Sequence, residues 1–152
     1  MWKTLAKTSL AVAATATLGS LATRPDDPWY QNLTKPSWQP PPAAFPLVWT
    51  PIYLTIAYAS ARAINRAPAA SRPTLTRSLA VNLTLNAAWT PLFFLLQSPK
   101  AALIDITLLN LSNAHLIYHS HKSDPPSALL LLPYATWTTF ATALTTSITL
   151  NN

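Results

Sequence analysis

The sequence predicts an all-α protein, an integral membrane bundle of five transmembrane helices with an ordered, proline-rich first loop. Two observations predict this fold. Only 9% of the 152 residues are charged and 50% are hydrophobic, whereas about 25% of residues are charged in soluble domains. The few charges also separate five apolar stretches, each close to the ~20 residues that a helix needs to cross a bilayer. The length favours one domain, residues 1–152.

Five helices are predicted along the chain, at about residues 5–22, 45–61, 78–96, 101–118 and 128–150. The second, third and fifth contain no charged residue, and the fourth contains only Asp105. The first and fifth are rich in Thr and Ser, whose hydroxyls bond the backbone of their own helix and are tolerated in lipid. For the first stretch, which follows Lys3, a cleavable signal peptide is the alternative. We favour an integral helix, because the other four helices would otherwise lose a packing partner.

The linkers carry most of the prolines and charges. Residues 23–44 form the one long loop, with six prolines. Because proline lacks an amide hydrogen and fixes φ, we expect an ordered, extended or turn-rich cap and no helix there. Residues 62–77 form a second loop with four arginines, residues 97–100 a tight turn and residues 119–127 a short polar loop. Seven Lys and Arg residues on the side of the amino terminus, against three on the other side, predict a cytoplasmic amino terminus.

Composition excludes several classes of function. With one glycine and no cysteine, the chain has no glycine-rich phosphate loop, disulfide framework, thiolate metal site or cysteine nucleophile. The basic residues are scattered between apolar runs and form no clustered face, so no nucleic-acid partner is expected. No catalytic triad or acid–base pair is visible. The lipid bilayer is the expected partner, and no cofactor is required.

The ionisable residues of the fourth predicted helix are candidates for function. Asp105 lies one turn inside it, and a carboxylate within a membrane is by default a functional hypothesis. We favour the alternative, a position near the interface with a hydrogen bond to the third loop or to a helix start. His115 and His119 are one turn apart, as two metal ligands can be, but no acidic third ligand shares their face. Together with His121 they are expected to be interfacial, and no metal site is predicted.

Three predicted helices place aromatic and amide side chains on shared faces. Spacings of three and four residues put each of three sets on one helical stripe. These sets are Asn82, Asn86, Trp89 and Phe93; Trp49 and Tyr53; and Tyr134, Trp137 and Ala141. An aromatic-walled cavity with a few polar groups suits a flat macrocycle, because ring faces stack and amides fix the orientation. Alternatively, the aromatics fill the bundle core and the asparagines bond neighbouring helices.

Short motifs in the long loop and in four of the predicted helices occur in a recognisable order. They are Trp29-Tyr30, Leu33, Lys35-Pro36, Trp38, Pro40-Pro41, Phe45, Val48-Trp49 and Tyr53, then Asn86-Ala87-Ala88-Trp89, Pro91-Leu92-Phe93-Phe94, Ala102-Leu103-Ile104-Asp105, Leu132-Pro133-Tyr134, Trp137 and Phe140-Ala141. Together they resemble the translocator protein family, also called tryptophan-rich sensory proteins or the TspO/MBR family. The resemblance runs from Trp29 to Leu144, about three quarters of the chain.

This resemblance implies a bundle of five membrane helices, often a homodimer, with a ligand pocket between the helices beneath a lid formed by the first loop. The implied ligands are flat and hydrophobic: protoporphyrin IX and haem-like tetrapyrroles, sterols, and synthetic benzodiazepines or isoquinolines. The motifs imply ligand-binding roles for Tyr30, Trp49, Asn86, Trp89 and Trp137, to which the shared helix faces add Tyr53 and Ala141.

The implied function is that of a membrane receptor or carrier for tetrapyrroles, in porphyrin homeostasis or stress. The alternatives are an enzyme that degrades protoporphyrin IX oxidatively or photochemically, using Trp49 and Trp137, and a non-catalytic membrane scaffold. Sterol binding is expected to be weak or absent, because Thr146 stands where the family has a tyrosine and no arginine follows. The mitochondrial outer membrane is the favoured location, with the endoplasmic reticulum or a bacterial envelope as alternatives.

Overall fold

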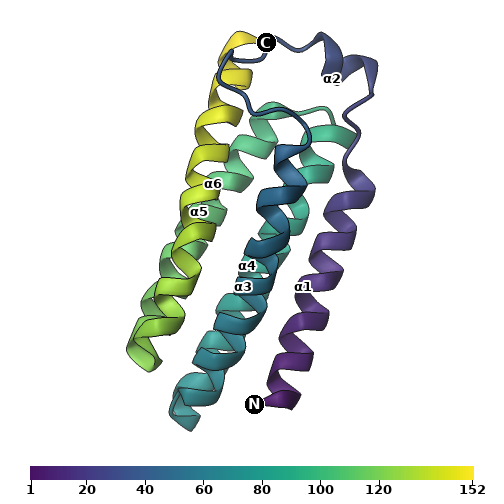
Figure 1. Ribbon diagram of the computed structural model, residues 1–152. Coiled ribbons are helices and arrows are strands. Elements are labelled where there is room, and N and C mark those ends of the chain that lie inside the picture. Colours follow the sequence, from purple (N-terminus) through teal and green to yellow (C-terminus); the bar gives the residue numbers. More distant parts are fainter.

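The computed structural model describes all of residues 1–152, and every regular element in it is helical. Five long helices form an elongated bundle, and a short helix lies in the loop that crosses one end (Figure 1). The helices are α1 (Trp2–Ala22), α2 (Pro28–Asn32), α3 (Ala44–Arg66), α4 (Arg72–Thr90), α5 (Pro99–Ser123) and α6 (Pro125–Asn151), with a 3₁₀ turn at Ala69–Ser71 and a π-helical turn at Pro91–Leu95. The predicted all-α fold is confirmed.

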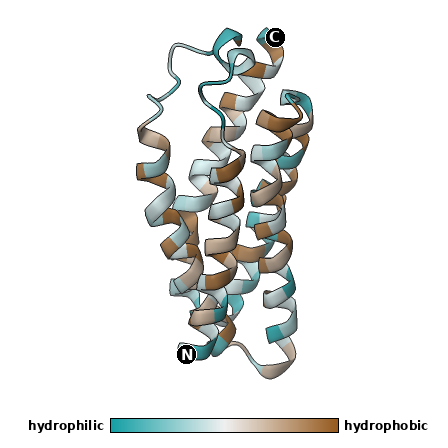
Figure 2. Cartoon of the chain, turned by 90° about the vertical axis from the view of Figure 1, so that its right-hand side faces the viewer, coloured by the Kyte–Doolittle hydropathy of each residue, from teal (hydrophilic) through white to brown (hydrophobic).

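Four of the long helices are long and apolar enough to cross a membrane: α1, α3, α4 with its flanking turns (Ala69–Leu95), and α6. Leucines such as Leu10 and Leu54 are exposed on their outer faces, as expected of helices that face lipid. Hydrophilic residues gather in the loop at one end and at the opposite tips of the helices (Figure 2). The 25-residue α5 packs against α4 and α6, and it is not among the four spans that length and composition indicate. Composition therefore marks four spans in this bundle, where five had been predicted.

The helices are longer than predicted, so the second loop is shorter. Arg66 lies in the last turn of α3, where the helix dipole favours a cation. Pro73 lies in the first turn of α4, where its missing amide hydrogen costs no helical bond. The loop expected at residues 62–77 is thus reduced to residues 67–71, which include the short 3₁₀ turn.

The polar loop expected at residues 119–127 is wrong, because only Asp124 separates α5 from α6. Asp124 has an extended backbone with φ −160°, and its Oδ2 accepts a hydrogen bond from the Ser127 amide at 3.2 Å. This bond caps α6. Pro125 and Pro126 occupy the first turn of the helix, where proline is tolerated.

The connection from α1 to α3, which we call the lid, contains a helix where none was predicted. Asp27 caps α2, because its Oδ1 accepts a hydrogen bond from the Trp29 amide at 2.8 Å. Pro28 follows at the first helical position, which its fixed φ suits. Lys35 closes the other end by donating from Nζ to the Tyr30 carbonyl at 2.5 Å. Proline therefore starts a helix here, and the lid is ordered across the end of the bundle (Figure 1).

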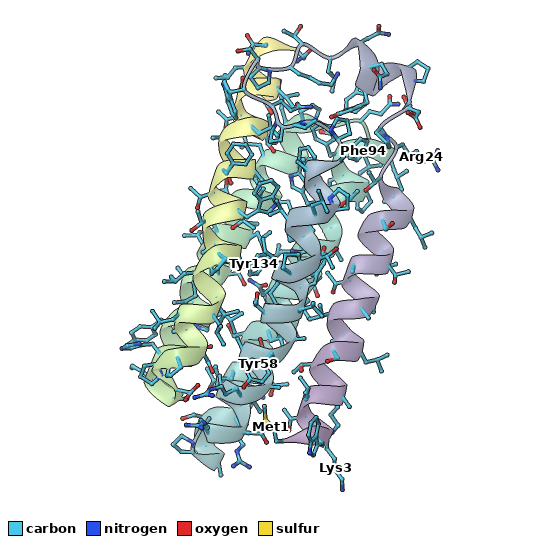
Figure 3. The ribbon with its side chains drawn as sticks, in the orientation of Figure 1. Met1, Lys3, Arg24, Tyr58, Phe94 and Tyr134 are labelled. Atoms are coloured by element: carbon cyan, nitrogen blue, oxygen red, sulfur yellow. The ribbon has the colours of Figure 1, made fainter.

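The buried side chains form two main apolar clusters along the bundle axis. The larger cluster joins α1, α3, α4, α5 and α6 through residues that include Ile56, Leu83, Leu109 and Tyr134. The smaller cluster lies next to the lid and consists of Phe93, Phe94, Ala102, Leu144 and Ile148. Figure 3 labels Phe94 beneath the lid and Tyr134 at mid-height of the bundle. Trp89 packs against both clusters, so it marks the level at which they meet.

Candidate functional site

Aromatic side chains predicted to bind a ligand gather between the larger apolar cluster and the lid. On α3, Trp49 stacks on Tyr53 with ring centroids 5.0 Å apart, because residues four apart share a helix face. Tyr134 of α6 meets Trp49 edge-on at 6.1 Å. Helices α3 and α6 thus form one wall of the candidate site.

Helix α4 and the lid form a second wall. Trp89 stacks on Phe93 with centroids 4.9 Å apart and planes inclined by 11°. Tyr30 of α2 meets Phe93 at 6.2 Å and Phe94 at 5.2 Å. The two phenylalanines therefore connect Tyr30 to Trp89, and the lid residue reaches the bundle interior through them.

Trp137 of α6 lies in a third aromatic group. It stacks on Phe140 at 5.3 Å and meets Phe45 edge-on at 5.9 Å. Ala141, one turn further along α6, is half-buried. Five of the seven predicted site residues pack against the same larger apolar cluster, namely Trp49, Tyr53, Trp89, Trp137 and Ala141. We call these five, together with Tyr30 and Asn86, the aromatic site.

Asn86 is the polar centre of the aromatic site. Its Oδ1 accepts a hydrogen bond from Tyr53 Oη at 3.1 Å, and its Nδ2 donates to Tyr134 Oη at 2.9 Å. Tyr134 Oη in turn donates to Asn82 Oδ1 at 3.0 Å. Both polar groups of the Asn86 amide are therefore engaged inside the protein, where they tie α3, α4 and α6 together. The ligand contact predicted for Asn86 stays a prediction.

The hydrogen-bonded chain extends further than the sequence indicated. Asn82 Nδ2 donates to Asn113 Oδ1 at 2.7 Å, and Asn113 Nδ2 donates to Thr138 Oγ1 at 2.9 Å. Asn113 and Thr138 had not been singled out as site residues. An amide inside an apolar stretch signals that a polar partner exists, but the sequence does not say on which helix the partner lies.

Three polar atoms near the aromatic rings are buried without a hydrogen-bond partner: Trp89 Nε1, Trp137 Nε1 and Gln39 Oε1. Gln39 belongs to the lid, and its Nε2 donates to Tyr30 Oη at 3.2 Å. Buried donors and acceptors in folded proteins are almost always paired. The aromatic site thus combines stacking surfaces with two free indole N–H donors, and the lid beside it adds one free amide oxygen, Gln39 Oε1.

Asp105 of α5 is buried without a full set of hydrogen bonds, whereas the histidines of the same helix lie nearer its surface. Asp105 is only 6% exposed, and its Oδ2 has no hydrogen-bond partner. The expected bond to the third loop or to a helix start is absent. His115 is exposed, and its Nδ1 lies 2.9 Å from Ser78 Oγ. The rings of His115 and His119 lie 4.4 Å apart, and no group of three His, Asp or Glu side chains is arranged to hold a metal ion.

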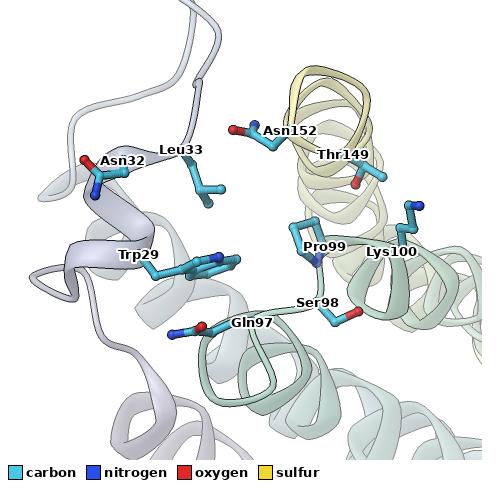
Figure 4. A pocket seen from close by; sticks show the side chains of 9 residues that line it. All are labelled: Trp29, Asn32, Leu33, Gln97, Ser98, Pro99, Lys100, Thr149 and Asn152. Atoms are coloured by element: carbon cyan, nitrogen blue, oxygen red, sulfur yellow. The ribbon is translucent and has the colours of Figure 1, made fainter.

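An open cavity of about 520 Å³ lies between the lid and the adjoining ends of α5 and α6 (Figure 4). Its lining residues are Trp29, Asn32, Leu33, Gln97, Ser98, Pro99, Lys100, Thr149 and Asn152. Trp29 meets Phe93 edge-on at 5.6 Å, so one aromatic wall separates this cavity from the aromatic site. The cavity was not predicted, because three segments far apart in the sequence build it.

At the end of the bundle away from the lid, Asp124 joins α3 to the α5–α6 corner. Arg62 Nε lies 2.6 Å from Asp124 Oδ2, and Arg66 Nη1 lies 3.3 Å from Oδ1. Ser127 Oγ donates to Oδ2 at 2.5 Å. The hydrogen bond from Arg62, supported by Ser127 and Arg66, lowers the pKa of Asp124 to about 2 although burial opposes the change. We call Asp124, Arg62, Arg66 and Ser127 the Asp124 clamp.

A family profile and several individual proteins are similar in sequence to this chain, and all of them belong to one group of relatives. A profile of the TspO/MBR family matches residues 8–150. A tryptophan-rich protein TspO from Chlorobaculum tepidum is 35% identical over 82% of this chain and 80% of its own. A tryptophan-rich sensory protein from Cereibacter sphaeroides is 34% identical over 88% of this chain and 82% of its own. The translocator protein of Bos taurus is 34% identical over 74% of this chain and 68% of its own. The similarity thus extends from bacteria to an animal and does not select one membrane.

Proposed function

The chain belongs to the TspO/MBR family of membrane proteins, and from this we propose that it is a receptor or carrier for protoporphyrin IX and similar flat, hydrophobic tetrapyrroles. In the proposed complex the macrocycle stacks against Trp49 and Trp137, and Tyr30 of the lid covers it. Asn86 positions Tyr53 and Tyr134 beside the ligand. The lid opens to admit the ligand, because these rings lie beneath it.

The unpartnered indoles are the observation that carries this proposal. Trp89 Nε1 and Trp137 Nε1 are buried without an acceptor, and a buried unsatisfied donor costs about 1–3 kcal/mol. A ligand with oxygen acceptors on the rim of a flat ring would satisfy these donors. Its faces would stack on Trp49 and Trp137, a contact worth about 0.5–1.5 kcal/mol beyond burial. Tetrapyrroles with carboxylate side chains combine both properties.

The cavity beside the lid supports the same ligand class. It offers an aromatic wall at Trp29 and a cation at Lys100, which is exposed and has no acidic partner. An anionic side chain of a tetrapyrrole would be solvated there, while the ring moves into the apolar interior. The cavity therefore suits the entry path of an amphipathic, dianionic macrocycle.

The test is protoporphyrin IX binding to the purified protein in lipid nanodiscs, followed by quenching of tryptophan emission. Trp49→Ala and Trp137→Ala should each weaken binding by about tenfold or more, because each removes a stacking face together with its buried area. Trp2→Ala is the matched control, since Trp2 is 82% exposed at the far end of α1. If both variants bind as tightly as the control, the indoles are core packing and the proposal fails.

The same titration, run in light and in darkness, separates a receptor from an enzyme. With a receptor, the absorption bands of the bound porphyrin keep a constant intensity over time in both conditions. Light-dependent loss of these bands, abolished by Trp49→Phe or Trp137→Phe, would instead show degradation. A protein that binds no porphyrin in either condition would be left with the role of a membrane scaffold.

Weak sterol binding follows from the end of α6. Thr146 Oγ1 donates to the backbone carbonyl of Thr142 at 2.8 Å, so its hydroxyl is already engaged, and residues 147–152 contain no cation. We expect a photoreactive cholesterol analogue to label residues 144–152 only weakly and without saturation. Tight, saturable labelling of this segment would contradict the expectation.

A further inference from the structure

The net charge of the protein is concentrated at the end of the bundle away from the lid. Although scattered along the sequence, seven of the ten Lys and Arg residues gather there: Lys3, Lys7, Arg62, Arg66, Arg72, Arg77 and Lys122. Asp124 is the one carboxylate at this end, whereas the lid and the adjoining half of α5 hold three cations and three carboxylates. One end therefore carries the whole net charge of +6. Figure 3 labels Lys3 at this end and Arg24 next to the lid.

Most of these cations have no anionic partner within the protein. Both ion pairs of the protein join Asp124 to Arg62 or Arg66, and the Asp124 side chain is only 4% exposed. Its charge is used inside the Asp124 clamp and neutralises none of the other cations. The remaining five are exposed and unpaired: Lys3, Lys7, Arg72, Arg77 and Lys122. Because like charges gathered at one end repel one another, a counter-charge from outside the chain would stabilise this end.

The exposed cations lie at similar depths on separate helices. Ser78 Oγ of α4 lies 2.9 Å from His115 Nδ1 of α5, which sets the antiparallel register of these helices. Arg72 lies six residues before Ser78, and Lys122 lies seven residues after His115. At 1.5 Å of rise per residue, Arg72 and Lys122 are therefore almost level. Lys3 lies in the first turn of α1, which begins at the same end of the bundle (Figure 1).

The surroundings of the cations indicate a membrane surface. Lys7 and Arg77 lie more than one turn inside their helices and are exposed on the outside of the bundle. Three aromatic side chains are exposed at the same end: Trp2, Tyr58 and Tyr118. Lys122 Nζ lies 4.3 Å from the centre of the Tyr118 ring. Aromatic rings beside long basic side chains are typical of the boundary between hydrocarbon and headgroups. This arrangement favours lipid phosphates over a polyanion in solution.

We propose that this end of the bundle binds phospholipids with a net negative headgroup in preference to zwitterionic phospholipids. The α3–α4 corner is the main contact. Arg72 Nε donates to the Ala67 carbonyl at 3.1 Å, which holds the guanidinium beside the residue that follows Arg66. The Nη groups of Arg72 have no partner in the protein, and a guanidinium can donate two parallel hydrogen bonds to a phosphate. This lipid contact is independent of the porphyrin ligand.

The experiment uses the protein reconstituted in phosphatidylcholine bilayers with a trace of spin-labelled phosphatidylglycerol or spin-labelled phosphatidylcholine. Electron spin resonance measures the fraction of each label that the protein immobilises. Wild-type protein should favour phosphatidylglycerol by about threefold or more, because one cation near an anionic headgroup provides about fivefold and only one leaflet is selective. The preference should disappear at about 1 M salt, where the screening length is ~3 Å.

Arg72→Gln should lower the preference by about twofold or more, and Arg72→Lys, which keeps the charge, should retain most of it. Arg24→Gln is the matched control, because Arg24 is an exposed arginine at the opposite end. It should keep the wild-type preference, and circular dichroism checks that all variants are folded. Equal immobilisation of the two lipids by wild-type protein, or equal loss in Arg72→Gln and Arg24→Gln, overturns the inference. Displacement of phosphatidylglycerol by soluble heparin would also overturn it and assign the surface to a soluble polyanion.

Discussion

Tyr134→Phe removes a single oxygen atom from the centre of the hydrogen-bonded chain in the bundle. Tyr134 is 1% exposed, and its hydroxyl accepts from Asn86 and donates to Asn82. The substitution therefore breaks two bonds and leaves two buried amide groups without this partner. Because phenylalanine preserves the ring and its edge contact with Trp49, almost no cavity is created.

The expected loss of stability follows from these two bonds. A typical internal hydrogen bond contributes about 0.5–1.5 kcal/mol, and double-mutant cycles in a membrane protein average about 0.6 kcal/mol. Two bonds therefore give a loss of roughly 1–3 kcal/mol in the free energy of unfolding. Tyr118→Phe is the matched control, since it deletes the same atom from a side chain that is 54% exposed. It should change stability by less than about 0.5 kcal/mol.

The unfolding free energies of Tyr134→Phe and Tyr118→Phe are measured by unfolding with dodecyl sulfate in mixed micelles, with helix content followed by circular dichroism. The cycle formed with Asn86→Leu tests the pairing directly. The two substitutions share one bond, so their combined effect should be smaller than the sum of the single effects. Equal unfolding free energies for Tyr134→Phe and Tyr118→Phe would refute the view that this chain of bonds stabilises the bundle.

Three further predictions concern the helix ends. The pKa of Asp124 is lowered, so its pairing with Arg62 contributes full stability above the ordinary carboxyl pKa near 3.8. This contribution is lost as the pH falls toward about 2. Asp124→Asn should therefore flatten the acid side of a curve of unfolding free energy against pH. Asp27→Ala removes the cap of α2, so amide exchange in the lid should accelerate, with a loss of about 1 kcal/mol of local stability. Gln97 has a φ of 50°, so Gln97→Gly should raise the melting temperature slightly, by relief of up to ~1 kcal/mol of strain.

The long helices were predictable because membrane-spanning segments contain very few charged residues. A charged group in hydrocarbon is costly, so uncharged runs of about the right length report membrane helices reliably. The helix ends were not predictable in this way. Arg62 and Arg66 continue α3 because long basic side chains extend toward a polar surface while their backbone stays helical. Around the prolines the sequence predicted too little helix. Pro28 and Pro125 each begin a helix, although loops were predicted at both positions.

The aromatic site was predictable only in part. Spacing along one helix predicted that Trp49 shares a face with Tyr53 and that Trp89 shares a face with Phe93. In the structure each pair is in contact and stacks. Contacts between helices leave no comparable pattern in the sequence. For this reason the link from Asn86 to Tyr134 and the isolation of Asp105 became visible only with the helices in place.

The Asp124 clamp also bears on the order in which the protein is made. Asp124 lies 62 residues after Arg62, so during synthesis α3 exists long before its partner. Until the α5–α6 corner has emerged and inserted, Arg62 and Arg66 are available to lipid phosphates at the membrane surface. Closure of the clamp pairs both arginines with the buried Asp124 carboxylate, although the Arg66 side chain stays 58% exposed. A chain truncated before this corner cannot form these two ion pairs, so α3 is left without its connection to the α5–α6 corner.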